Sequence, residues 1–176
     1  MRYVALLRGI NVGGNTMIKM AELKTEFERL GFKNVVTYIN SGNLVFDSRK
    51  MSEERLASRL ETAIEAGFGK AIDVMVREQA DIKRVIENNP FAGEYESHKQ
   101  MHVLFLKAEL PREKVELLSE MDFGQERLVI ADREIYFYLP LGVADSLFSK
   151  KAPLDKKPRV AYTARNWRTV QNLSEL

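Results

Sequence analysis

Arginine, asparagine and glycine are concentrated in one short stretch near the N-terminus, Arg8-Gly9-Ile10-Asn11-Val12-Gly13-Gly14-Asn15-Thr16. Three glycines within six positions mark backbone that needs a positive φ or that another group must approach closely. The backbone N–H groups of Gly13 and Gly14 would cradle a phosphate or carboxylate, with Arg8 supplying positive charge and Asn11 directional hydrogen bonds. The stretch therefore predicts a binding site for a small anionic ligand, for example a nucleotide. The alternative is that the glycines only turn the chain and the asparagines only cap local backbone.

The same stretch is an incomplete phosphate loop. Gly9-x-x-x-x-Gly14-Asn15-Thr16 matches the GxxxxGK[ST] pattern, except that Asn15 stands where the pattern has its lysine. Because that lysine neutralises charge in the transition state of phosphoryl transfer, nucleotide hydrolysis is not predicted. A hairpin expected around residues 40–43 also opposes a fold of parallel strands joined by helices. The loop is therefore predicted to bind an anion through its backbone N–H groups without hydrolysing it.

Other catalytic arrangements have little support in the sequence. His98 and His102 are the only two histidines and neither has a partner at metal-ligand spacing; His102 lies in an apolar run and is predicted to be a half-buried strand residue. Ser41 lacks the GxSxG context of a hydrolase nucleophile. The absence of cysteine excludes disulfides, thiolate catalysis and cysteine-bound zinc. No cofactor and no metal are predicted, and whether the protein is an enzyme stays open, because no acid–base pair or nucleophile is visible.

The elements that must position these residues follow from the period of the apolar residues and from the turn residues. In the first half, the pattern predicts strands at 2–8, 34–39, 43–47 and 72–76, and helices at about 20–30, after Ser52, and at 78–88. In the second half, it predicts strands at 101–107, 127–131, 134–139 and 159–163, and helices after Pro111 and at 143–149 and 166–176.

The order βαββαβ therefore occurs twice, each time with a trailing helix. It predicts an α+β fold of two ferredoxin-like (α/β-plait) units, each an antiparallel sheet with helices packed on one face. Residues 1–90 would form the first unit, residues 91–99 a polar connector and residues 100–176 the second unit. Sequence identity between the halves is negligible, although Arg77 and Arg165 both stand where a last strand meets its trailing helix.

This topology brings a second polar segment to the glycine-rich loop. In a ferredoxin-like unit the first strand lies between the third and the fourth, and the third strand runs antiparallel to it. The third strand therefore begins beside the point where the first one ends, which places Asn40-Ser41-Gly42-Asn43 next to the loop. The predicted ligand-binding residues come from both segments: Arg8, Asn11, Gly13, Gly14, Asn40, Ser41 and Asn43.

Composition sets the alternatives. The chain has 176 residues, 45% of them hydrophobic and 30% charged, with a net charge of +2, which is typical of a globular protein. No stretch approaches the roughly 18 apolar residues of a membrane span, so no membrane partner and a cytoplasmic location are expected. Seven basic residues lie between Lys150 and Arg168, with Asp155 as the only acid there, which makes a weak nucleic-acid-binding module the alternative function. A protein-interaction module without a ligand is the third.

Four motifs carry a resemblance to a known family: Leu6–Gly14, Tyr38–Asn43, Asn89-Pro90-Phe91 and Thr163–Val170. With them, the chain from Arg2 to Leu176 resembles a bacterial family catalogued only as domain of unknown function 1697. The resemblance implies a duplicated ferredoxin-like fold, in agreement with the repeated pattern. It implies no reaction, cofactor or catalytic residue.

The sequence departs from that family at one place. Many relatives carry basic residues after the glycine that corresponds to Gly142, whereas this chain has Val143-Ala144-Asp145-Ser146-Leu147. The departure weighs against an anion site there. Arg165 and Asn166 then remain as secondary candidates for a ligand site, in addition to the glycine-rich loop.

Overall fold

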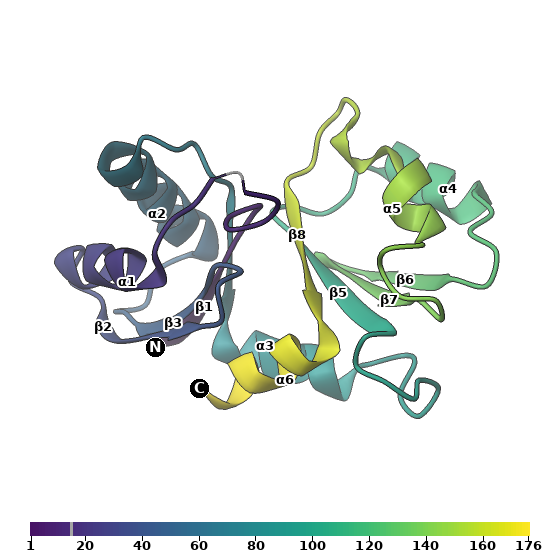
Figure 1. The fold of residues 1–176 in the computed structure, drawn as a ribbon, viewed down its shortest axis with the longest axis horizontal. Helices are drawn as coiled ribbons and strands as arrows, with labels where there is room; N and C mark the ends of the chain where they lie inside the picture. Colours follow the sequence, from purple (N-terminus) through teal and green to yellow (C-terminus); the bar gives the residue numbers. More distant parts are fainter. Residues whose placement is uncertain (15) are drawn as a thin grey trace. The chain divides into compact units, whose positions relative to one another are not determined.

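The computed structural model of the protein describes residues 1–14 and 16–176. The first half contains β1 (Arg2–Leu7), α1 (Met20–Arg29), β2 (Lys33–Tyr38), β3 (Asn43–Asp47), α2 (Glu53–Phe68), β4 (Val74–Glu78) and α3 (Gln79–Glu87) (Figure 1). The four strands form one antiparallel sheet in the order β2-β3-β1-β4.

The second half repeats this arrangement. It contains β5 (Met101–Leu106), α4 (Arg112–Glu120), β6 (Arg127–Ala131), β7 (Glu134–Tyr138), α5 (Leu147–Lys151), a short 3₁₀ helix (Pro153–Asp155), β8 (Tyr162–Asn166) and α6 (Trp167–Glu175). The sheet order β6-β7-β5-β8 matches that of the first half, strand for strand. Arg77 pairs with Val4 of β1, and Arg165 pairs with Val103 of β5, so the two arginines occupy equivalent rungs. The predicted fold of two ferredoxin-like units is confirmed.

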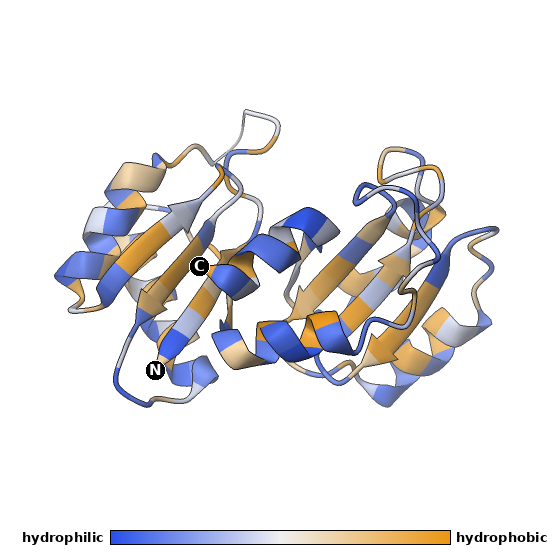
Figure 2. Ribbon diagram, turned by 90° about the horizontal axis from the view of Figure 1, so that it is seen from below, coloured by the Kyte–Doolittle hydropathy of each residue, from blue (hydrophilic) through white to orange (hydrophobic). Residues whose placement is uncertain are grey.

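Alternation along the strands builds the core of the first half. Tyr3, Ala5 and Leu7 of β1 point to the same side of the sheet and are fully buried against Phe27 of α1 and Leu60 of α2. Figure 1 shows α1 and α2 together over this side of the sheet. In Figure 2, hydrophobic residues follow the strands, whereas the helices carry hydrophilic residues between their apolar ones. This amphipathic pattern is the one from which the sequence predicts the helices.

The core of the second half is built in the same way. Leu104 of β5 and Phe137 of β7 lie on one side of their sheet and pack with Leu118 of α4 and Phe148 of α5. Trp167, the first residue of α6, is 4% exposed. On the other side of the sheet, Tyr136 Oη donates to the carbonyl of Val85 at 3.0 Å.

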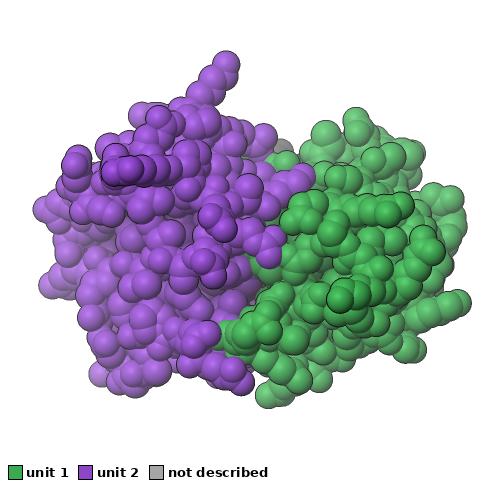
Figure 3. All heavy atoms as spheres, turned by 180° about the vertical axis from the view of Figure 1, so that it is seen from behind, with its two compact units in different colours: residues 1–84, 172–176 green, residues 85–171 purple. Residues whose placement is uncertain are grey.

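The described chain forms two compact units (Figure 3). The first unit comprises residues 1–84 and 172–176, and the second comprises residues 85–171, so the two boundaries fall within α3 and α6. Arg2 of β1 donates to the carbonyl of Leu176 at 2.6 Å, which ties the C-terminus to the first sheet. The domain limits expected from the sequence, 1–90, 91–99 and 100–176, stay a prediction about folding units.

The last strand of each half begins later than the sequence predicts. The expected strand at 72–76 is β4, Val74–Glu78, because its ladder ends where β1 ends, at the pair Leu7 and Val74. The expected strand at 159–163 is β8, Tyr162–Asn166, since its final pair is Leu106 and Tyr162. Apolar residues just before each ladder are buried without being part of the strand.

The helix predicted at 143–149 is α5, and it begins at Leu147. Ser146 caps it, because its hydroxyl accepts from the Ser149 N–H at 3.1 Å. Residues 143–146 form the turn that leads into this cap. Ser52 caps α2 as the sequence predicts, accepting from the Arg55 N–H at 3.3 Å.

Candidate functional site

The glycine-rich loop and the turn before β3 lie side by side at one edge of the first sheet. The Leu7 N–H donates to the Gly42 carbonyl at 2.8 Å, and Asn11 Nδ2 donates to the Asn40 carbonyl at 2.8 Å. At Gly42 the φ angle is +80°, and an added Cβ would lie 2.8 Å from Leu7 Cβ and 2.9 Å from Ile10 Cδ1. Glycine is therefore required here both by conformation and by close approach, and the juxtaposition expected from the topology is present.

The amide side chains of this edge hold its own backbone. Asn11 Oδ1 accepts from the Ile18 N–H at 2.8 Å, while Asn11 Nδ2 donates to the Ile18 carbonyl at 2.9 Å as well as to Asn40. Asn43 is fully buried and donates to the Tyr38 carbonyl at 3.0 Å and to Ser41 Oγ at 2.9 Å. Both hydrogens of each amide group are thus used within the chain. These bonds fix the shape of the loop and the turn, and contact of these amides with a ligand stays a prediction.

The arginine of the glycine-rich loop, Arg8, forms an ion pair with the carboxylate of Asp73. Arg8 is partly buried, and its Nη1 lies 3.9 Å from Asp73 Oδ2. Gly13 and Gly14 are exposed, with φ angles of +62° and +76°, and open space surrounds the position of a Cβ at each. Asn15, the residue at the lysine position of a phosphate loop, lies outside the described residues. The glycine backbone is accessible, but the positive charge beside it is partly neutralised.

The secondary candidates, Arg165 and Asn166, stabilise the junction between β8 and α6. Arg165 is buried, and its Nη1 donates to Thr163 Oγ1 at 2.6 Å and to the Ala164 carbonyl at 2.8 Å. Burial lowers the pKa of Arg165 to about 10. Asn166 Oδ1 accepts from the Thr169 N–H at 2.9 Å, as the cap of α6. Because Arg165 is buried, it does not belong to an exposed basic surface, and nucleic-acid binding by residues 150–168 stays a prediction that depends on the exposed lysines.

The segment after Gly142 is already bonded to a carboxylate of the chain itself, Glu126. Glu126 accepts from the N–H groups of Leu147 at 2.7 Å and Phe148 at 3.0 Å, and from Ser146 Oγ at 3.2 Å. The first N–H groups of α5 are therefore bonded to Glu126. An external anion would have to displace this carboxylate, which agrees with the doubt that the sequence raised about a site here.

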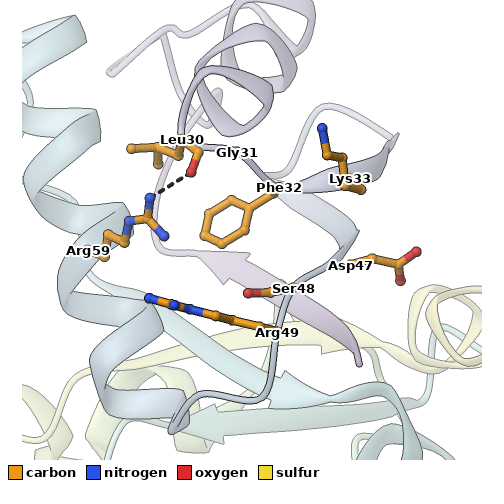
Figure 4. Close-up of a pocket in the computed structure, with 8 residues that line it drawn as sticks. All are labelled: Leu30, Gly31, Phe32, Lys33, Asp47, Ser48, Arg49 and Arg59. Carbon is orange, nitrogen blue, oxygen red and sulfur yellow. Dashed lines mark hydrogen bonds between the residues drawn. The ribbon is translucent and has the colours of Figure 1, made fainter.

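A hollow in the first unit gathers cations that the sequence analysis did not single out (Figure 4). It has a volume of about 410 Å³ and lies at the other end of the β2–β3 hairpin from the turn, where Lys33 pairs with Asp47. The lining residues come from the α1–β2 connection, the end of β3 and α2: Leu30, Gly31, Phe32, Lys33, Asp47, Ser48, Arg49 and Arg59. Three of these eight side chains are cationic and one is a carboxylate. We refer to this feature as the basic hollow.

The arginines of the basic hollow face a common space. Figure 4 shows the guanidinium groups of Arg49 and Arg59 on the same side of the Phe32 ring, and Lys33 and Asp47 on the other side. Arg59 is held in place, since its Nη2 donates to the Leu30 carbonyl at 2.6 Å and its Cζ lies 5.1 Å from the centre of the Phe32 ring. Arg59 is thus oriented by the fold before any ligand arrives.

The carboxylate of the basic hollow is neutralised by other groups. Asp47 accepts from Asn34 Nδ2 at 2.6 Å and pairs with Arg2 Nη1 at 3.0 Å. The hydrogen bond from Asn34, together with the bond and charge of Arg2, lowers the pKa of Asp47. Asp47 is therefore ionised at neutral pH, and its charge is balanced by Arg2 instead of by the arginines of the basic hollow.

The described part of the chain, all but residue 15, holds no group of three or more His, Cys, Asp or Glu side chains that could bind a metal ion. Among the same residues, no helix has the length and apolar character needed to cross a membrane.

Comparisons with known proteins place the chain in one family. A family model described as "Protein of unknown function (DUF1697)" matches residues 1–136. Among solved structures, the chain is similar to the conserved bacterial protein SP0830 from Streptococcus pneumoniae, with 28% sequence identity and a TM-score of 0.75. That similarity covers 99% of this chain and 97% of the other. No curated protein matches. Neither description names an activity.

Proposed function

We propose that this chain, which belongs to the DUF1697 family of proteins of unknown function, binds a small phosphate- or carboxylate-bearing molecule in its basic hollow. The observation that carries the proposal is the pair of arginines, Arg49 and Arg59, whose guanidinium groups face one space beside Phe32. Two like charges that face the same space repel each other, and an anion between them removes that repulsion.

The chemistry of the lining residues suits such a ligand. A guanidinium group presents several N–H donors in one plane and matches the oxygens of a phosphate or carboxylate. One N–H group of Arg59 is used by the Leu30 carbonyl, and its other N–H groups are available to a ligand. Ser48 adds a hydroxyl to the same lining. The volume of about 410 Å³ accommodates a molecule larger than a single phosphate ion.

The glycine-rich loop is the other place where an anion would bind. There the exposed backbone N–H groups of Gly13 and Gly14 would supply the donors. The loop offers a single arginine, Arg8, which already lies near Asp73. The basic hollow offers two arginines, and the carboxylate of its lining, Asp47, lies on the other side of Phe32, so we favour the basic hollow.

The test is isothermal titration calorimetry at fixed ionic strength, with pyrophosphate, inorganic phosphate and succinate as probes. Arg49→Gln removes one cation of the hollow without touching the contact of Arg59 with Phe32. Lys50→Gln is the matched control, because Lys50 is exposed, adjacent in sequence and outside the lining. A hydrogen bond to a charged group contributes about 1.5–3 kcal/mol, so Arg49→Gln is expected to weaken binding about tenfold or more.

The variants separate the two sites. Affinity in Lys50→Gln is expected to stay within about a factor of two, since Lys50 lies outside the lining and acts on the anion only through solvent and salt. Gly13→Val is expected to leave the affinity unchanged if the basic hollow is the site. Equal losses in Arg49→Gln and Lys50→Gln would indicate unspecific charge screening, and a loss in Gly13→Val alone would place the anion at the loop. If none of the three probes gives binding heat, the proposal is overturned.

A further inference from the structure

A second hollow adjoins the basic hollow, in the groove between the end of α1 and the neighbouring side of α2. It has a volume of about 450 Å³ and lies between Arg29 and Leu30 on one side and Ser58, Thr62, Ala63 and Ala66 on the other. Leu30 and Arg59 belong to both linings, and the hydrogen bond from Arg59 Nη2 to the Leu30 carbonyl lies where the two hollows meet (Figure 4). We refer to this second feature as the helix groove. A molecule bound in the basic hollow can therefore extend into the helix groove.

The lining of the helix groove suits an apolar chain. Positions three and four apart lie on the same side of a helix, and the short side chains of Thr62, Ala63 and Ala66 leave space there. Among the described residues that line the groove, none is acidic. With a rise of 1.5 Å per residue, the stretch from Ser58 to Ala66 runs for about 12 Å along α2. The space is thus elongated, and it offers few groups that an uncharged chain would have to desolvate.

The two ends of the helix groove differ in charge. At the end away from the basic hollow, Arg29 donates to the carboxylate of Glu26 at 2.9 and 2.6 Å, so this pair carries no net charge. Glu26 lies beside Ala66, because its carboxylate is 3.8 Å from the position of a Cβ on Gly67. The other end opens toward the guanidinium groups of Arg49 and Arg59. A negatively charged head group is therefore attracted to the end at the basic hollow, and an apolar chain attached to it would extend toward Ala66.

We propose that the ligand of this protein is an amphiphilic phosphate or carboxylate. Its head group binds between Arg49 and Arg59, and its short alkyl chain lies in the helix groove along α2. The inference rests on the proposed function, because it takes the basic hollow as the site of the head group. It adds that the helix groove, through Thr62, Ala63 and Ala66, selects ligands by their apolar chain.

The experiment compares methyl phosphate with hexyl phosphate, which share a head group and differ in the length of the chain. Each is titrated into the full chain at fixed ionic strength, while spectra record the arginine Nε–H groups and the methyl groups of Ala63 and Ala66. Both probes are expected to shift Arg49 and Arg59, and only hexyl phosphate is expected to shift the two alanines. Each half-buried methylene group strengthens binding by about twofold, so hexyl phosphate is expected to bind about thirtyfold more tightly.

The variant Thr62→Gln places a longer polar side chain in the helix groove. Its preference for hexyl over methyl phosphate is expected to fall by about tenfold, because the amide keeps water in the groove. Its affinity for methyl phosphate is expected to stay unchanged. Thr25→Gln is the matched control, since Thr25 is an exposed threonine of α1 outside both linings, and it is expected to keep the full preference.

The outcomes separate this inference from the proposed function. If the two phosphates bind equally tightly and both shift Arg49 and Arg59, the inference is overturned and the proposed function stands. If neither phosphate binds, both are overturned. The inference is also overturned if Thr62→Gln and Thr25→Gln keep the same preference. Signals of Ala63 and Ala66 that change with protein concentration alone would mean that a second copy of the chain covers the groove, which would likewise overturn it.

Discussion

Replacing Gly42 by alanine tests the close contact between the glycine-rich loop and the turn before β3. The new Cβ would lie 2.8 Å from Leu7 Cβ and 2.9 Å from both Ile10 Cδ1 and Ile10 Cγ1. Leu7 Cβ is fixed to a central strand and cannot move aside without moving β1. Overpacking of this kind costs about 1–3 kcal/mol, and the φ angle of +80° adds about 1–2 kcal/mol for a residue with a Cβ.

Gly69→Ala is the matched control for this change. Gly69 caps α2 with a φ angle of +65°, and nothing lies within 4 Å of an added Cβ. Both substitutions restrict the unfolded chain equally, so that contribution cancels in the comparison. The difference between the two variants therefore isolates the clash with Leu7 and Ile10.

Urea unfolding followed by circular dichroism measures both variants. We expect Gly69→Ala to lose about 1–2 kcal/mol of unfolding free energy and Gly42→Ala to lose about 1–3 kcal/mol more. Equal losses would refute the reasoning, because the close packing of the turn on the end of β1 would then contribute nothing.

Two further predictions concern the second unit. Lys114 is buried, and its Nζ donates to the carbonyls of Pro153 at 2.6 Å and Lys156 at 2.9 Å. We expect Lys114→Met to lower the free energy of unfolding in urea by about 2 kcal/mol, because both carbonyls lose their donor. The control Lys150→Met, at an exposed lysine, is expected to change it hardly at all. Burial lowers the pKa of His102 from 6.5 to about 4. Between these two pH values the unfolded chain therefore binds a proton at His102 that the folded chain does not bind. Stability is therefore expected to fall by up to about 3 kcal/mol as the pH drops from about 6.5 to 4, and unfolding midpoints of His102→Leu should lack this part of the pH dependence.

The fold could be predicted from the sequence because apolar period and turn residues agree along most of the chain. Leu56, Leu60 and Ile64 mark the buried side of α2, and Ser52 marks its start. The starts of β4 and β8 could not be predicted, since they depend on where β1 and β5 end. Ile72 and Val160 look like strand residues in isolation, but both precede the first pair of their ladders.

The edge formed by the loop and the turn could also be predicted, because it follows from strand order alone. The partners of its side chains could not. Asn11 and Asn43 look like ligand-binding amides in the sequence, and only the structure shows that their amide groups bond to nearby carbonyls and to Ser41.

The basic hollow could not be predicted from the sequence because its arginines are separated along the chain. Arg49 follows β3, Arg59 lies on α2, and Phe32 precedes β2. One signal was available: the hairpin of β2 and β3 brings Lys33 to Asp47, and with it the basic segment that follows Asp47. Placing Arg59 in addition requires the packing of α2 on α1, which no local pattern gives.

The measurement that tests the central proposal most directly is a chemical-shift titration of the ¹⁵N-labelled protein with pyrophosphate, recorded for backbone amides and for arginine Nε–H groups. If the anion binds in the basic hollow, the largest shifts will be those of the Arg49 and Arg59 side chains and of the backbone at residues 30–33 and 47–49, with little change at Gly13 and Gly14. Shifts confined to Gly13, Gly14 and Arg8, or spread evenly over the exposed lysines, would contradict the proposal.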